Sequence, residues 1–269
     1  MKTCPYEKCV LVTGASSGIG KETAERFAKG GFEVYALSRS VKEETTVFDG
    51  GGTMHGLRGD VTDAKSIQNA LSRIERLGIV IHCAGFGIAG SAEYVTSQQA
   101  KRQMDTNYFG VINVNNLALP LLRKNKRSLV MFTSSVGGII PIPYQSHYSS
   151  SKYALEAYAV ALEMEAKGFG VRVCIVEPGD VKTSFTASRE VCEREDSPYY
   201  GKCKESVSNM EKSEQRGSNP IDVAKVFFKM AHRKRPKIRV AVGLQYKIYA
   251  FLIKLLPTRF KNFVIAKMY

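Results

Sequence analysis

A glycine-rich turn near the amino terminus constrains the fold of this chain more than any other feature. Residues 13–20 read TGASSGIG, and they separate a short apolar run at residues 9–13 from a segment with helical periodicity at residues 21–30. A strand, a turn without bulky side chains and a helix begin a βαβ unit, in which the backbone can approach a pyrophosphate at the positive helix end. A plain tight turn would explain the glycines alone, but their position after the first strand favours a dinucleotide site.

The rest of the chain alternates between β-prone and helical patterns. Strands are expected at residues 32–37, 57–61 (weakly), 78–84, 128–133 and 171–176, and helices at residues 64–76, 98–122 and 149–167. This alternation predicts one doubly wound α/β domain of the Rossmann type, with a parallel sheet, over residues 1–269. Its cofactor and catalytic core is expected at residues 8–185. Residues 184–218 are polar and poor in periodicity, so we expect a substrate loop or lid there, or a solvated surface excursion.

The composition fits a globular enzyme but leaves the charge to be explained. With 44% hydrophobic and 24% charged residues, the chain is neither wholly disordered nor a polytopic membrane protein. The formal net charge is +14, and no acidic residue follows Asp222. An anionic cofactor, an acidic carrier protein or an acidic membrane would each suit this charge. The six cysteines lack metal-ligand spacing, so no metal is expected, and without a signal-like start we expect a cytoplasmic protein.

The end of the second predicted strand indicates which dinucleotide binds. A protein that binds NAD ordinarily has an acidic residue there, roughly 20 residues past the glycines, for the ribose hydroxyl. This chain has Ser38 and Arg39, and a guanidinium can pair with the 2′-phosphate of NADP. We therefore predict NADP(H), with a solvated surface arginine as the alternative. Asp60 is expected to bind the adenine amino group or to cap the next helix, for which Asp63 is better placed.

Tyr148 and Lys152 are the candidate catalytic residues. They stand four residues apart at the start of a predicted helix and so share one face. An ammonium group and a positively charged nicotinamide would both lower the pKa of the phenol. Tyr148 would then exchange a proton with a substrate oxygen to which Ser135 also hydrogen-bonds, which is general acid–base catalysis. A Tyr-x-x-x-Lys pattern by itself fits an ordinary helix start better than a catalytic pair.

The combination of motifs resembles the short-chain dehydrogenase/reductase family over about residues 8–185, and most of all its hydroxysteroid- and retinol-dehydrogenase-like branch. The resemblance implies a catalytic tetrad of Asn107, Ser135, Tyr148 and Lys152, in which Asn107 holds a water that links Lys152 to solvent. It also implies a homodimer or homotetramer. The implied cofactor-binding residues are Gly14, Ser16, Ser17, Gly18, Ile19, Gly20, Ser38, Arg39, Asp60, Val61, Cys83, Ala84, Gly85, Tyr148, Lys152, Pro178, Gly179, Val181 and Thr183.

One motif departs from the family pattern. The family usually has Asn-Asn-Ala-Gly after the fourth strand, whereas this chain has His82-Cys83-Ala84-Gly85. We expect cofactor binding to survive and the local hydrogen bonding of the sheet to differ. Cys83 is expected to be a buried structural thiol, because nothing nearby in sequence would lower its pKa. His82 and His147 are expected to be packing or rim residues, and Ser134 a structural residue at a strand end.

The C-terminal tail, residues 244–269, is basic and amphipathic. Residues 245–256 predict a helix whose apolar face carries Ile248, Phe251, Leu252, Leu255 and Leu256, and residues 259–269 form a second short apolar and basic segment. Both are too short and too charged to span a bilayer. We expect this helical extension to cap an apolar pocket or to form a subunit contact, with peripheral contact to an anionic membrane as the alternative.

Together these features predict an NADP(H)-dependent oxidoreductase for the carbonyl or alcohol group of an apolar substrate, which is steroid-, retinoid- or acyl-like. Candidate pocket walls are Ile139, Ile140, Ile142, Tyr144 and Phe185. A reductase of 3-oxoacyl thioesters on an acidic carrier protein is the alternative enzyme. A catalytically idle dinucleotide-binding sensor or scaffold is the alternative of another class, against which the complete tetrad argues. No nucleic-acid partner is expected, because no reading motif accompanies the basic tail.

Overall fold

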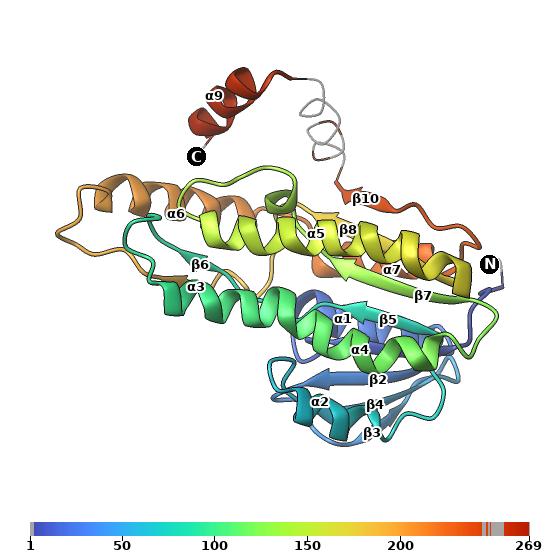
Figure 1. Ribbon diagram of the computed structural model, residues 1–269. Coiled ribbons are helices and arrows are strands. Elements are labelled where there is room, and N and C mark those ends of the chain that lie inside the picture. Colours follow the sequence, from blue (N-terminus) through green and yellow to red (C-terminus); the bar gives the residue numbers. More distant parts are fainter. Residues whose placement is uncertain (1–2, 244–245, 247, 249–255, 269) are drawn as a thin grey trace.

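The apolar runs of the sequence form the middle of an eight-stranded sheet (Figure 1). The computed structural model describes residues 3–243, 246, 248 and 256–268. The strand order is β10-β8-β7-β5-β1-β2-β4-β3, and within the described part of the chain only β3 runs antiparallel to its neighbour. The strands are β1 (Cys9–Thr13), β2 (Glu33–Ser38), β3 (Thr45–Val47), β4 (Thr53–Arg58), β5 (Ile79–His82), β7 (Ser128–Thr133), β8 (Val171–Pro178) and β10 (Arg239–Val242). A second sheet pairs β6 (Ile88–Ala89) with β9 (Glu190–Val191).

Helices cover both faces of the main sheet, which is why its central strands are apolar on both sides. Every residue of β1 and β5 is buried. The helices are α1 (Gly18–Lys29), α2 (Ala64–Leu71), α3 (Ser97–Met104), α4 (Gly110–Leu122), α5 (Ser146–Ala166), α6 (Tyr200–Gln215), α7 (Pro220–Ala231) and α9 (Thr258–Met268). Single helical turns lie at Asp105–Phe109, Val136–Gly138 and Lys167–Phe169. The predicted fold class, a doubly wound Rossmann domain with a C-terminal helical extension, is confirmed.

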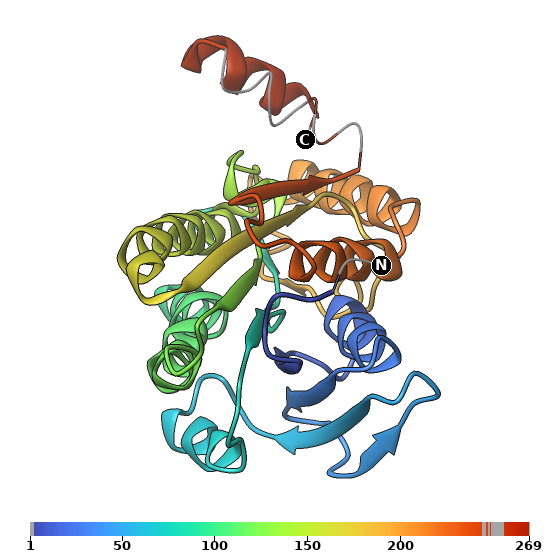
Figure 2. The same cartoon turned by 90° about the vertical axis from the view of Figure 1, so that its right-hand side faces the viewer.

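Each face of the sheet has its own hydrophobic core. On one face α2, α4 and α5 pack against the strands, and on the other face α1 and α7 do (Figure 2). The second core centres on aromatic edge-to-face contacts, in which the ring of Phe27 lies 5.1 Å from Phe32 and 5.2 Å from Phe228. These contacts hold α7 beside α1. They therefore fix the position from which the chain continues into β10.

The order of the strands places a crevice at one edge of the sheet. The chain passes from β1 to β2 on one side, and it later returns to pair β5 with the other side of β1. The loops that follow β1 and β5 therefore leave in opposite directions. Ligands of open α/β sheets bind at such a switch point, outside the carboxyl ends of the strands.

Three predicted elements differ from the structure. The strand expected at residues 57–61 is β4, which ends at Arg58, and its antiparallel neighbour β3 was not predicted because it is short and exposed. The helix expected at residues 64–76 ends at Leu71. The helix expected at residues 98–122 is interrupted by one π-helical turn at Asp105–Phe109, which contains Asn107.

The expectation of irregular structure over residues 184–218 is wrong for much of the segment. It contains β9 and the 16-residue helix α6. The buried face of α6 consists of Cys203, Ser206, Val207 and Met210, which have helical spacing. The signal was weak because a serine occupies one of these buried positions. The strand β10 forms one edge of the sheet, and α7 packs on one face of it; the sequence analysis assigned neither element.

The predicted tail helix at residues 245–256 lies largely outside the described residues. Of its apolar face, Ile248 and Leu256 are described, whereas Phe251, Leu252 and Leu255 are not. The second tail segment is helical, as α9, and extends beyond the β10 edge of the sheet (Figures 1 and 2). Among the described residues, none of the helices has the length and hydropathy needed to cross a membrane.

A buried histidine makes the stability of this fold depend on pH. The ring of His82 stacks on Phe132 with centroids 5.1 Å apart, and its Nε2 hydrogen-bonds Oδ1 of Asn115 at 2.9 Å. Burial lowers its pKa from 6.5 to about 4, while the bond to Asn115 opposes this. As the pH falls, the unfolded chain binds the proton first. The contribution to stability is therefore complete above the unfolded pKa and is lost as the pH falls towards about 4.

We predict that the free energy of unfolding falls by about 2 kcal/mol more between pH 7 and pH 5 in the wild type than in His82→Gln. Urea denaturation at both values measures this. Ile81→Val is the control, because it changes a buried side chain of the same strand without removing a titrating group, and it should keep the wild-type pH dependence. An unchanged pH dependence in His82→Gln would contradict the assignment.

Candidate active site

A cavity of about 1110 Å³ lies at the carboxyl ends of the parallel strands. It begins at the glycine-rich turn after β1, passes the ends of β2 and β4, and reaches Tyr148 and α6. Drug-sized ligands occupy cavities of roughly 300–1,000 Å³, so there is room for a dinucleotide and a substrate. All the predicted cofactor-binding residues line this cavity, and so do Ser135, Tyr148 and Lys152 of the predicted tetrad. Asn107 does not line it.

The glycine turn is shaped by close backbone contacts. Gly14 has a φ of +66°, and a Cβ at this position would lie 2.7 Å from the backbone of Ala84. The Thr13 hydroxyl accepts hydrogen bonds from the amides of Cys83 and Ala84, both at 3.2 Å. The turn after β1 is therefore pressed against the end of β5.

The start of α1 fits an anionic group. Ser17 precedes the helix, but its side chain makes no hydrogen bond to the first amides of α1. Helix N-termini with available amides bind phosphate groups. Because Ser16, Ser17 and Gly18 all line the cavity, the residues present fit the pyrophosphate of a dinucleotide.

The residues expected to bind the adenosine part of the cofactor lie at the ends of β2 and β4, and they line the cavity. Arg39 is exposed and lines the cavity directly after β2, and the Ser38 hydroxyl accepts a hydrogen bond from the amide of Val41 at 3.0 Å. Asp63 caps α2 by accepting hydrogen bonds from the amides of Lys65 and Ser66, as expected. Asp60 instead accepts from the amide and the hydroxyl of Thr62, both at 2.9 Å. Asp60 thus holds the turn after β4 at the cavity wall.

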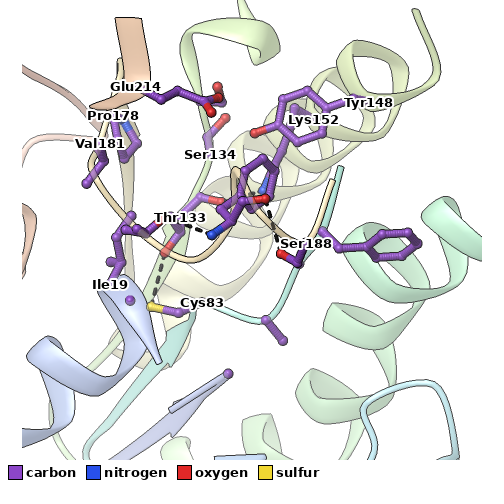
Figure 3. A pocket seen from close by; sticks show the side chains of 18 of the residues that line it. Ile19, Cys83, Thr133, Ser134, Tyr148, Lys152, Pro178, Val181, Ser188 and Glu214 are labelled. Atoms are coloured by element: carbon purple, nitrogen blue, oxygen red, sulfur yellow. Dashed lines mark hydrogen bonds between the residues drawn. The ribbon is translucent and has the colours of Figure 1, made fainter. Parts of the chain in front are cut away.

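At the other end, α5 brings Tyr148 and Lys152 together (Figure 3). The Nζ atom of Lys152 lies 5.8 Å from the centre of the Tyr148 ring and donates a hydrogen bond to the carbonyl oxygen of Thr133 at 2.9 Å. Ser135 follows β7 and caps the turn Val136–Gly138, where its hydroxyl accepts from the amide of Gly137 at 3.1 Å. The three side chains therefore meet where β7 and α5 approach one another.

Burial dominates the electrostatics of this pair. It raises the pKa of Tyr148 to about 12, against a hydrogen bond with Ser135 that lowers it. The charge of Glu214 adds to the increase, and that of Arg189 opposes it. Burial likewise lowers the pKa of Lys152 to about 8. In the protein by itself, removal from water therefore outweighs neighbouring charge and raises the phenol pKa. The lowering of this pKa by a bound nicotinamide stays a prediction.

Asn107 positions a loop instead of lining the cavity. Its Oδ1 accepts from the amide of Phe86 at 3.1 Å, and its Nδ2 donates to the Phe86 carbonyl oxygen at 3.1 Å and to the Ser151 hydroxyl at 3.0 Å. A Cβ on Gly85 would lie 3.1 Å from Asn107 Oδ1. Asn107 therefore ties the loop after β5 to α5. The water between Asn107 and Lys152 stays a prediction.

The residues that depart from the family pattern have structural roles. The thiol of Cys83 accepts a hydrogen bond from the Thr133 hydroxyl at 3.2 Å, and burial raises its pKa to about 12. Cys83 is thus a partly buried thiol whose raised pKa disfavours the reactive thiolate form. Ser134 is buried at the end of β7, and its amide donates to the carbonyl oxygen of Val176 at 2.8 Å. His147 is partly buried and does not line the cavity.

The substrate end contains residues that the sequence analysis missed. Of the expected walls, Ile140, Ile142 and Phe185 line the cavity, whereas Ile139 and Tyr144 do not. Additional lining residues come from α6 and from the tail: Asn209, Met210, Ser213, Glu214, Tyr246, Leu256, Lys261, Val264 and Ile265. Ile265 is buried and shares a small core with Val136 and Ile140. The helical spacing of the buried face of α6 was the one signal that pointed to this helix.

The fold and the residues gathered in the cavity define a dinucleotide-binding oxidoreductase, and known proteins show its family. The sequence model described as short chain dehydrogenase matches residues 8–193. The chain is 38% identical over 240 residues to a 3-ketodihydrosphingosine reductase of Bacteroides thetaiotaomicron, with 87% of each protein covered. It is 29% identical over 248 residues to human 17-beta-hydroxysteroid dehydrogenase type 1. That alignment covers 86% of this chain and 76% of the human protein.

A solved short-chain dehydrogenase from Streptomyces avermitilis has the same fold. It aligns with a TM-score of 0.78 and 25% identity, and 90% of each chain is covered. The chain therefore belongs to the short-chain dehydrogenase/reductase family, as its motifs predict, and its relatives include a hydroxysteroid dehydrogenase. It is an oxidoreductase that acts on a carbonyl group or the corresponding alcohol.

Gly14 and Gly51 form a matched pair for substitution, because they share a positive φ but only Gly14 lies against the end of β5. Both have positive φ, +66° and +75°, but a Cβ on Gly51 meets nothing within 4 Å. Gly51→Ala should lose about 1 kcal/mol of unfolding free energy through backbone strain alone. Gly14→Ala should lose at least about 1 kcal/mol more, because its methyl group meets the backbone of Ala84, and should weaken dinucleotide binding. Urea denaturation measures both losses, and equal values would contradict the contact.

Proposed function

We propose that this chain is an NADP(H)-dependent oxidoreductase that reduces the carbonyl group of a long apolar substrate, with Tyr148 as the proton donor. The observation that carries the proposal is the lining of the cavity, which contains Tyr148 and Ser135 together with a set of apolar side chains. These apolar side chains come from four separate segments: Ile140, Ile142, Phe185, Met210, Val264 and Ile265.

The proposed chemistry divides the work between cofactor and protein. When bound, the nicotinamide group supplies or accepts the hydride. Burial keeps the Tyr148 phenol protonated at neutral pH, so it is suited to donate a proton to the carbonyl oxygen. Ser135 would donate a hydrogen bond to the same oxygen and hold it within reach of Tyr148. Lys152 would bind the nicotinamide ribose, and Asn107 would act indirectly by positioning the loop after β5.

Two features support NADP(H) over NAD(H). The place of the usual acidic residue after β2 is taken by Ser38, and the exposed guanidinium of Arg39 lies at the same end of the cavity. A guanidinium can form two parallel hydrogen bonds with a phosphate group.

The substrate class is proposed from the walls of the cavity and from the relatives. The 3-ketodihydrosphingosine reductase named above acts on a ketone, and the apolar walls suit a substrate with a long chain. A reductase of 3-oxoacyl thioesters on an acidic carrier remains the second candidate, favoured by the net charge of +14. A catalytically idle sensor is the least favoured reading, because Ser135, Tyr148 and Lys152 are brought together.

We assign the tail the role of a cap over the substrate end of the cavity. Support comes from α9, whose residues Lys261, Val264 and Ile265 line the cavity, with Ile265 buried against Val136 and Ile140. Peripheral contact of the tail with an anionic membrane, a homodimer or homotetramer, a cytoplasmic location and the absence of a nucleic-acid partner stay predictions.

The cofactor proposal predicts that the wild type binds NADPH more tightly than NADH. Arg39→Ala should weaken NADPH binding roughly 10-fold or more, through loss of a charge-assisted contact of about 1.5–3 kcal/mol, and should change NADH binding little. Fluorescence titration gives both dissociation constants. Arg123→Ala, an exposed arginine at the end of α4, is the matched control. Equal affinity of the wild type for the two cofactors would contradict the proposal.

The catalytic proposal predicts that Tyr148→Phe lowers kcat about 10²- to 10⁴-fold, since only the proton donor is lost, while NADPH binding stays nearly unchanged. Steady-state reduction of a long-chain ketone and a binding titration measure the two effects. Tyr153→Phe is the matched control, because Tyr153 lies one turn further along α5 and is 41% exposed. Near-normal turnover by Tyr148→Phe would assign the proton transfer to another group.

A further inference from the structure

A second cavity lies at the amino ends of three neighbouring parallel strands. It has a volume of about 560 Å³ and is formed largely by the segments that precede β7, β8 and β10. The active-site cavity lies at the carboxyl ends of the parallel strands, so the two cavities are at opposite ends of the sheet. In Figure 1 the amino ends of these strands lie on the right. We call the second one the basic cavity, because six of its eight lining residues are Lys126, Arg127, Lys167, Arg172, Lys234 and Arg235.

The positive charge of the basic cavity is not balanced by the protein. In the described part of the chain, no carboxylate belongs to its lining. Of the six cations, Arg172 is the one with an ion-pair partner among the described residues, since its Nη1 lies 3.0 Å from Oε1 of Glu163. The other five are exposed to solvent. Like charges gathered in this way repel one another and destabilise the fold, and a bound anion relieves that repulsion.

The backbone that carries these cations is held in place. Gly170 has a φ of +80°, and a Cβ there would lie 2.6 Å from the carbonyl oxygen of Lys126. The amide of Ser128 donates to the carbonyl oxygen of Gly170 at 3.1 Å, which joins the segments before β7 and β8. The hydroxyl of Tyr6, a buried residue, donates to the carbonyl oxygen of Arg233 at 2.8 Å and holds the segment before β10. The three segments therefore keep a fixed arrangement.

The wall at Tyr6 brings the charges of two segments together. Burial raises the pKa of the Tyr6 phenol, and the charges of Arg172 and Arg127 both oppose this rise. These two guanidinium groups therefore act on the same part of the cavity, although one belongs to the segment before β7 and the other to β8. Guanidinium groups can bind a phosphate group through two parallel hydrogen bonds.

The size and the spread of the cations limit what can bind. A recess of about 560 Å³ lies in the range of roughly 300–1,000 Å³ that small-molecule ligands occupy. The segments before β7 and β10 supply two cations each, and β8, which carries Arg172, lies between those strands in the sheet. Cations that come from three segments suit several negative groups along one molecule better than a single negative group.

We infer that the basic cavity binds a small soluble anion with two or more linked phosphate groups. One phosphate group meets the cations before β7, and another meets Lys234 and Arg235 before β10. Arg172 is available to the anion from the strand between them. This ligand site is separate from the cofactor and substrate cavity, so it does not depend on the proposed function.

Inorganic tripolyphosphate is the probe, and isothermal titration calorimetry with the full chain measures its binding. NADPH is present in excess, because the cofactor cavity also fits phosphate groups. The wild type should bind tripolyphosphate at one saturable site, and inorganic phosphate about 10-fold or more weakly, because it reaches fewer cations. Absence of binding, or equal affinity for the two anions, would overturn the inference. So would a protein that ignores tripolyphosphate but sediments with vesicles that contain phosphatidylinositol bisphosphate.

A triple variant connects this binding to the basic cavity. Arg127→Ala combined with Lys234→Ala and Arg235→Ala should raise the dissociation constant of tripolyphosphate about 10- to 100-fold, and the exposed side chains make loss of the fold unexpected.

The matched control removes the same charge from another surface. Lys202→Ala, Lys204→Ala and Arg216→Ala change three exposed cations on α6 or directly after it, none of which lines the basic cavity. The control should keep the wild-type dissociation constant. An equal loss of affinity in both triple variants would show general attraction to a basic protein and would overturn the inference.

Discussion

The close approach of two backbones at the switch point of the sheet is the constraint on which the site depends. The turn after β1 fits only because Gly14 has no side chain where the backbone of Ala84 passes, and the Thr13 hydroxyl joins the two segments. This contact aims the start of α1 into the cavity and fixes where the chain leaves β5. The free amides at the start of α1 and the loop that Asn107 holds are therefore both positioned by one local arrangement.

The catalytic end of the cavity is fixed by hydrogen bonds between segments that are distant in sequence. Asn107 lies in a π-helical turn between α3 and α4, and such turns are frequent at functional sites because they redirect one side chain. Here the redirected side chain bonds both to the loop after β5 and to Ser151 of α5. The helix that carries Tyr148 and Lys152 is thereby tied to the cofactor side of the cavity, so the two halves of the site keep their spacing.

Burial determines the pKa values of the ionisable groups in the cavity. Burial moves the pKa of Tyr148 up and that of Lys152 down, which brings both groups towards their neutral forms. The Arg189–Glu214 pair is likewise largely removed from solvent. In such surroundings charges and hydrogen bonds act more strongly than in water, so a few polar groups can orient a mostly apolar substrate.

The sequence by itself determined the nucleotide half of this protein. Glycine spacing, β-prone runs and the motifs at Tyr148 and Pro178 are local patterns, and local patterns specify strands, turns and their order. At the substrate half the sequence predicted three walls, Ile140, Ile142 and Phe185, and the tertiary structure decided the rest. It placed Glu214, Ile265 and Tyr246 in the wall of the same cavity as Tyr148 although up to 117 positions separate them, and it left Asn107 outside that wall. The reason is physical: contacts between distant segments depend on how whole elements pack, and the weak apolar face of α6 gained its partners only in the folded chain.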